Sequence, residues 1–172
     1  QKGYATPFVG DGQFARPASV NLMIHGDVGT GTTFEDSSPK KLALTNNNGV
    51  SHAGTSEFGG SALKFVRSSS QWIEVASSDA GDFGTEDWTV DYWFNMTSGQ
   101  ANRMHAISMG TYASSNISFN FNDSYSFWLY WNSSGGNYIR WGTAGDYGDG
   151  AWHHMAVTRA SGMIRVWVDG VH

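Results

Sequence analysis

The sequence contains no cysteine and only three prolines among its 172 residues. Without cysteine, neither a disulfide framework nor a thiolate zinc site is possible, so packing must stabilise the fold, with a hard cation as the one remaining inorganic support. The length is ordinary for one domain and is sufficient to bury a hydrophobic core. Because disulfides are the usual sign of an oxidising compartment, a chain without cysteine gives no indication of its cellular compartment.

Long apolar runs and basic clusters are also missing. No stretch approaches the roughly 20 apolar residues that cross a bilayer, so we expect no membrane insertion. Charged residues make up only 15% of the chain, and the formal net charge of -5 is spread without a run of Lys or Arg. Such a run is the usual footprint of phosphate-backbone binding, so nucleic acid is not an expected partner.

What the sequence does contain is typical of a β protein. Aromatic residues reach 15%, with eight Trp, and 22 Gly supply turns. Short apolar stretches separated by Gly, Asn and Ser predict strands at residues 20–25, 41–44, 62–66, 72–75, 88–95, 105–109, 117–122, 126–131, 138–141, 152–159 and 163–169. We expect an antiparallel sandwich or barrel over residues 19–172, preceded by an N-terminal lead-in or linker over residues 1–18.

Four sequence motifs indicate which family of β proteins the chain resembles. They are FGGSAL at residues 58–63, FGTEDWTVDYW at 83–93, WHHMAVTR at 152–159 and VWVDG at 166–170. Together they resemble the laminin-G-like branch of the concanavalin A-like lectin/glucanase domain family. The resemblance covers about residues 21–170 and implies an all-β fold, an antiparallel β-sandwich of the jelly-roll type. It also implies binding of sugars or other extracellular ligands, while some relatives hydrolyse glycans.

Alternation with a period of two separates the faces of the strands. In residues 89–94 the row of Val90, Tyr92 and Phe94 is the better core candidate. We predict that the eight strands from residue 72 onward form two antiparallel sheets, and that this row is buried between them together with Ala156 and Val166.

The opposite rows carry the candidate ligand-binding residues. Trp and Tyr rings stack on the apolar faces of sugar rings, while Arg supplies directional hydrogen bonds to hydroxyl groups. The candidates are Trp93, Trp128, Tyr130, Tyr138, Arg140 and Trp167. The alternative is that several of them fill the core or a subunit interface.

A calcium ion is a further expectation. The resemblance implies it, because pentraxin-like and laminin-G-like relatives hold calcium with oxygen ligands from loops. Asp27 and Asp169 are the first candidates, although Asp in turns also caps its own backbone. His153 and His154 are adjacent in a strand and point to opposite faces, so they cannot chelate one ion together; one is expected in the sandwich and the other on its surface.

Catalysis is not expected. The glucanase relatives carry Glu-x-Asp-x-Glu or Glu-x-Asp-x-x-Glu on one strand, which places an acid and a nucleophile in one cleft. The nearest match here has the shorter side chains of Asp87 and Asp91, with Thr89 where the middle Asp should be. We expect Asp91 to pair with a Lys or Arg of a neighbouring strand instead.

The leading interpretation is a non-catalytic binding module for carbohydrate, such as a surface glycan, on an extracellular or virion-surface protein. The alternatives are a structural or assembly domain with an aromatic face for protein contacts, and a glycan hydrolase. The resemblance also predicts a truncated domain, since the family's late strands would follow Gly170 and only Val171 and His172 do. Residues 20–25 and 163–169 would then lack partners, and exposed strand edges would favour a homo-oligomer.

Overall fold

The computed structural model describes residues 20–27, 29–75, 83, 85–97, 104–109, 117–121, 126–131, 137–141 and 147–172. The chain divides into two compact units, residues 1–82 and residues 83–172. The lead-in predicted at residues 1–18 lies outside the described residues.

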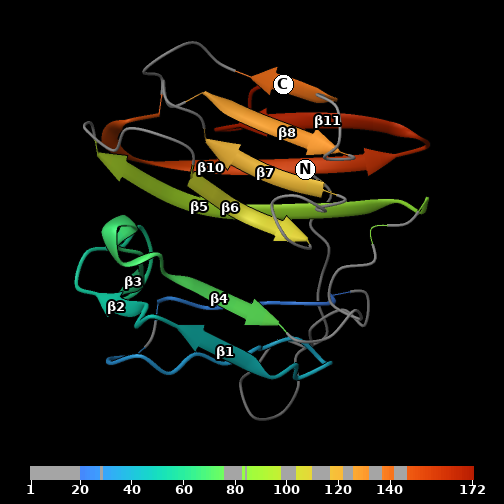
Figure 1. The fold of residues 1–172 in the computed structure, drawn as a ribbon. Helices are drawn as coiled ribbons and strands as arrows, with labels where there is room; N and C mark the ends of the chain where they lie inside the picture. The colour runs from blue at the N-terminus through green and yellow to red at the C-terminus, as the bar shows by residue number, and fades with distance from the viewer. Residues whose placement is uncertain are drawn as a thin grey trace. The chain divides into compact units, whose positions relative to one another are not determined.

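The first unit contains two antiparallel strand pairs, visible in Figure 1. Strand β1 (Leu44–Asn47) pairs with β4 (Trp72–Val75), β2 (Ser51–Ala53) pairs with β3 (Ala62–Lys64), and a short 3-10 helix, η1, spans Arg67–Ser69. The strand predicted at residues 20–25 is wrong, because that segment forms only the isolated bridge between Ile24 and Asp36.

A buried carboxylate takes the place of a strand partner at one position of residues 20–25. Asp36 is 4% exposed, and its Oδ1 accepts hydrogen bonds from the backbone N–H groups of Met23 and Ser38 at 2.9 and 2.8 Å. Its Oδ2 accepts from the Ser38 hydroxyl at 2.7 Å and from the Leu42 N–H at 2.9 Å. The Asp36 side chain thus binds the Met23 N–H, a backbone donor that would otherwise need a strand partner, while the Met23 carbonyl accepts from the Ser37 N–H.

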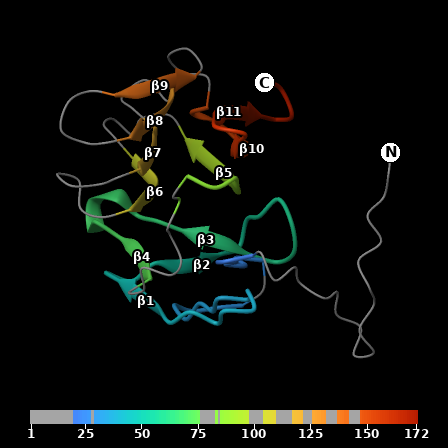
Figure 2. The same ribbon diagram turned by 90° about the vertical axis from the view of Figure 1, so that its right-hand side faces the viewer.

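The second unit is an antiparallel sandwich of two sheets. Its strands are β5 (Trp88–Thr97), β6 (Met104–Met109), β7 (Ile117–Phe121), β8 (Phe127–Trp131), β9 (Tyr138–Trp141), β10 (Asp149–Ala160) and β11 (Met163–Val168). One sheet has the order β6-β7-β8-β9 and the other β11-β10-β5. Figure 2 shows these sheets as two layers.

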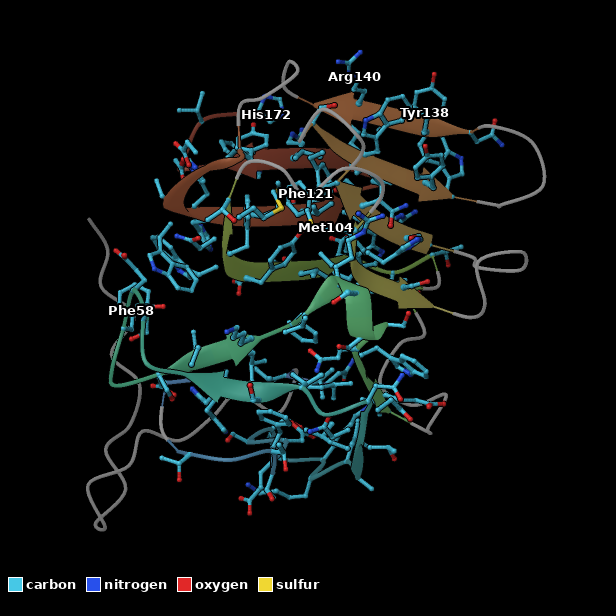
Figure 3. The ribbon with its side chains drawn as sticks, turned by 60° about the vertical axis from the view of Figure 1, so that its left-hand side comes forward. Phe58, Met104, Phe121, Tyr138, Arg140 and His172 are labelled. Atoms are coloured by element: carbon cyan, nitrogen blue, oxygen red, sulfur yellow. The ribbon has the colours of Figure 1, made fainter. Side chains whose placement is uncertain are left out.

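The core of this unit lies between the two sheets. Phe119, Phe127 and Leu129 come from the four-stranded sheet, and Met155 and Val157 from the three-stranded one; all five are fully buried or nearly so. In Figure 3, Phe121 and Met104 lie inside the unit. The all-β, antiparallel sandwich predicted from the sequence is confirmed.

Two details of the predicted core change. Val166 is buried, and Val90, Tyr92 and Phe94 pack against the core as expected, but Ala156 faces outward, opposite Asp91 and Trp167. The prediction for Ala156 is wrong because the register of β10 directs Met155 and Val157 inward. Strand β4 also belongs to the first unit, so the two sheets contain seven strands rather than eight among the described residues.

Candidate ligand-binding face

The outward row of β8 and β9 carries four of the six predicted ligand-binding residues. Phe127 and Leu129 point into the core, so Trp128 and Tyr130 point outward on the same strand. Antiparallel pairing places Arg140 opposite Trp128 and Tyr138 opposite Tyr130. We call this set, Trp128, Tyr130, Tyr138 and Arg140, the β8–β9 aromatic face.

The side chains of the β8–β9 aromatic face contact one another. The rings of Trp128 and Tyr130 are nearly parallel, with centroids 5.8 Å apart, and the Tyr138 centroid lies 4.4 Å from that of Trp128 and 5.5 Å from that of Tyr130. The Arg140 guanidinium carbon lies 5.6 Å from the Trp128 ring centroid, within cation–π range. These contacts hold the rings in place before any ligand arrives.

Tyr138 and Arg140 are the outermost members of the set. Tyr138 is 45% exposed, Arg140 is exposed, and Trp128 and Tyr130 are half-buried. Figure 3 shows Arg140 and Tyr138 projecting from β9 away from the body of the unit. The Trp128 Nε1 donates to the Ser126 hydroxyl at 3.1 Å, so this group is already occupied.

Beside this face, strand β7 presents a buried polar row. Ser118 and Asn120 lie opposite Tyr130 and Trp128, and both are buried on the side of the sheet away from the core. The Ser118 hydroxyl donates to Asn120 Oδ1 at 2.7 Å. Because a hydroxyl has one proton, His105 Nδ1, 3.1 Å from Ser118 Oγ, must be the donor to it. This chain of hydrogen bonds fixes the polar side chains next to the rings.

Ser118 and Asn120 are not among the residues predicted from the sequence to bind ligand. The signal was present, since Ile117, Phe119 and Phe121 alternate with these two polar residues. Two polar side chains in a strand normally indicate a solvent-exposed row. Here both are buried and stand opposite the large side chains of Tyr130 and Trp128 on the neighbouring strand, which a single strand's alternation does not show.

Trp93 and Trp167 lie elsewhere. They belong to β5 and β11 of the other sheet, where Trp93 packs on His154 with centroids 5.1 Å apart and Trp167 packs on His172 at 4.8 Å. Both are on the outward side of their sheet, since their neighbours in sequence face the core. The outer faces of two packed sheets point in opposite directions, so the six residues form two separate surfaces.

His153 and His154 take opposite sides of β10, as predicted. The His153 side chain is 13% exposed and lies between two carboxylates, with Nδ1 2.8 Å from Asp169 Oδ2 and Nε2 3.2 Å from Asp149 Oδ1. Its ring packs on Phe94 and Tyr147. Partial burial alone would lower the pKa of His153, but the hydrogen bonds to Asp169 and Asp149 outweigh it and raise that pKa.

The two residues predicted to bind calcium lie in different units. Both carboxylate oxygens of Asp169 have partners, because Oδ2 contacts His153 and Oδ1 accepts the His154 N–H at 2.8 Å. Asp27 Oδ1 lies 3.6 Å from His25 Nδ1 and is buried without a hydrogen-bond partner. Among the described residues, no group of three or more His, Asp or Glu side chains is arranged to hold a metal. Calcium binding stays a prediction.

Asp87 and Asp91, the two carboxylates considered for catalysis, have different structural surroundings. Asp87 Oδ1 accepts the Ser161 N–H at 2.8 Å and so fastens the turn of the β10–β11 hairpin. Asp91 faces outward opposite Ala156. Within the described part of the chain Asp91 forms no ion pair, so the expected partner Lys or Arg is absent there.

Comparison with known families agrees with this architecture. Residues 67–172 match the model of the concanavalin A-like lectin/glucanase superfamily, in its laminin-G-like form. The chain belongs to this superfamily. The match includes the whole sandwich of β5 to β11 and therefore both outer faces. Membership in this superfamily indicates a binding module in general.

No curated protein and no solved structure gives a significant match to the chain. Within the described segments, no helix has the length and apolar character needed to cross a membrane.

Proposed function

We propose that this protein is a non-catalytic carbohydrate-binding module, and that the glycan binds on the β8–β9 aromatic face. The observation that supports this most directly is the clustering of three aromatic rings and one guanidinium on the outward side of two paired strands. A glycan ligand also favours placement on an extracellular or virion-surface protein, where such ligands are met.

The physical basis is a platform of fixed rings with polar groups at its edge. Sugar rings present apolar C–H faces to aromatic rings, and their hydroxyls take hydrogen bonds from side chains nearby. Tyr138 offers the most exposed ring of the set and Arg140 the adjacent donors. Because Tyr138 contacts the rings of Trp128 and Tyr130 and Arg140 contacts the ring of Trp128, little side-chain entropy is lost when the ligand binds.

The surroundings of Asp87 support binding without turnover. A retaining glycosidase needs two carboxylates about 5 to 5.5 Å apart, one free to donate a proton and one free to attack. The carboxylate of Asp87 accepts a backbone hydrogen bond in the hairpin, a structural role. Thr89 stands between it and Asp91, where the glucanase pattern has a third acid.

A structural or assembly domain is the second candidate, and the other outer face favours it. Trp93 is 42% exposed and Met163 is 58% exposed on the three-stranded sheet. Exposed apolar side chains on one sheet face are typical of protein contacts. Oligomerisation of the pure protein that Trp93→Ala prevents, with no glycan binding, would favour this function.

The test is glycan-array binding followed by titration of the best ligand. Tyr138→Ala and Trp128→Ala should each weaken binding about tenfold or more, as expected for a central aromatic contact. Trp93→Ala is the matched control, because it removes an equally large exposed ring from the opposite face. Equal losses in Trp93→Ala and Tyr138→Ala, or release of reducing sugar by the wild-type protein, would contradict the proposal.

A further inference from the structure

The charge of the β8–β9 aromatic face narrows the class of glycan. Across the four-stranded sheet, the described outward positions opposite one another are His105, Ser108, Ser118, Asn120, Trp128, Tyr130, Tyr138 and Arg140. None of these is Asp or Glu. Arg140 thus supplies a permanent positive charge to this face of a chain whose net charge is -5.

Arg140 has no acidic partner among the described residues. It forms no ion pair with any of them, and its guanidinium contacts the Trp128 ring. An exposed guanidinium has five N–H donors and no acceptor. It therefore remains available for a ligand anion.

Two polar groups of this face and its neighbouring strand already have partners within the protein. Asn120 Oδ1 accepts from Ser118, and Trp128 Nε1 donates to Ser126. A neutral sugar has hydroxyl protons that need acceptors, and carboxylates are the strongest acceptors a protein offers. The described part of this face lacks them, so it suits a ligand that brings acceptors rather than protons.

The position of the Arg140 guanidinium relative to the aromatic rings indicates where the ligand has its anionic group. The Arg140 guanidinium lies over the Trp128 ring, and the more exposed Tyr138 ring contacts the same Trp128 ring. A planar guanidinium pairs in two parallel hydrogen bonds with a carboxylate. We infer that the ligand is an acidic glycan built from uronic acids, whose ring stacks on Tyr138 while its carboxylate pairs with Arg140.

This inference rests on the proposed carbohydrate binding, and the experiment separates the two. Polygalacturonate and its methyl ester have the same backbone and differ in the carboxylate charge. The wild-type protein should bind polygalacturonate at least about tenfold more tightly than the methyl ester, measured by titration calorimetry at low salt. Added NaCl should reduce this preference, because exposed ion pairs are screened.

Variants of Arg140 assign the preference to one side chain. Arg140→Gln should bind both polymers with the affinity of the wild-type protein for the methyl ester, and Arg140→Lys should recover only part of the preference. Arg165→Gln is the matched control, because it removes an Arg from the other outer face of the sandwich and should change nothing. Circular dichroism checks that each variant is folded.

Other results of these binding measurements would contradict either the uronic acid inference or the proposed carbohydrate binding. Equal binding of the two polymers, with Tyr138→Ala still weakening both, would refute the uronic acid and leave carbohydrate binding intact. Dextran sulfate binding as tightly as polygalacturonate, with Arg140→Lys unaffected, would replace carboxylate recognition by general charge attraction. Failure of these polymers and of every neutral glycan to bind would refute the proposed function itself.

Discussion

At the scale of single residues, the buried carboxylate of Asp36 ties together three backbone segments of the first unit. It accepts four hydrogen bonds, from Met23, Leu42 and, twice, Ser38. Asp36→Asn keeps the shape of the side chain but replaces one carboxylate oxygen by an NH2 group. This group cannot accept the hydrogen bonds that the oxygen accepts, so we expect a loss of about 3 kcal/mol in unfolding free energy. Urea denaturation followed by circular dichroism measures it. Glu35→Gln, at the exposed neighbouring position, should cost almost nothing.

The same carboxylate predicts an acid dependence of stability. Burial opposes ionisation of Asp36, but the hydrogen bonds from Ser38, Met23 and Leu42 outweigh it and lower its pKa from 3.8 to about 2. A depressed pKa stabilises the folded state above pH 3.8, and this contribution is lost as pH falls through about 2. The loss should approach about 2 kcal/mol. Asp36→Asn should remove this part of the acid slope; an unchanged slope would place it in other carboxylates.

At the scale of elements, His153 links the start of β10 to the end of β11. Its ring lies between Asp149 and Asp169 and packs on Phe94 and Tyr147. The pKa of His153 is raised, so its protonated form stabilises the fold fully below the ordinary value of 6.5, provided that the carboxylates are ionised. That contribution is lost as pH rises through the raised pKa.

We therefore predict that the wild-type protein loses stability as pH rises above the ordinary histidine pKa of 6.5 and that His153→Gln flattens this slope. Thermal unfolding at several pH values measures it. Asp169→Asn should remove most of the same slope, because it takes away the closer carboxylate. Asp91→Asn, which removes an outward carboxylate of the same sheet that does not contact His153, should leave it unchanged.

The elements themselves could be predicted well from the sequence where apolar residues alternate. The predicted strands 72–75 and 138–141 coincide with β4 and β9, and those at 88–95 and 117–122 differ from β5 and β7 by one or two residues at an end. For residues 20–25, the alternation of apolar residues predicts a strand that the structure does not have. The Met23 N–H donates to the Asp36 side chain, 13 residues away, and no local sequence pattern predicts such a partner.

At the scale of the whole sandwich, the sequence could predict which residues face outward but not which of them meet. Trp128, Tyr138, Trp93 and Trp167 all lie in outward rows, as alternation requires. Their division into two surfaces depends on which strands share a sheet, and strand order is set by contacts between residues far apart in the chain. The buried position of Ser118 depends on the same contacts.

The packing of the two sheets gives the last prediction, which concerns Phe94. Its ring extends from β5 to the four-stranded sheet, where its centroid lies 4.6 Å from that of Phe121. Phe94→Ala should lower the unfolding free energy by about 3 kcal/mol, because the cavity removes contacts to both sheets. Trp93→Ala, one residue away on the outer face, should cost less than about 1 kcal/mol.

Urea unfolding monitored by circular dichroism and by tryptophan fluorescence measures both variants. If the sheets share one core, the two signals should change together in Phe94→Ala, at a lower urea concentration than in the wild-type protein. A cost for Phe94→Ala no larger than that for Trp93→Ala would place the row of Val90, Tyr92 and Phe94 outside the core. Separate transitions would mean that each sheet is stable without the other.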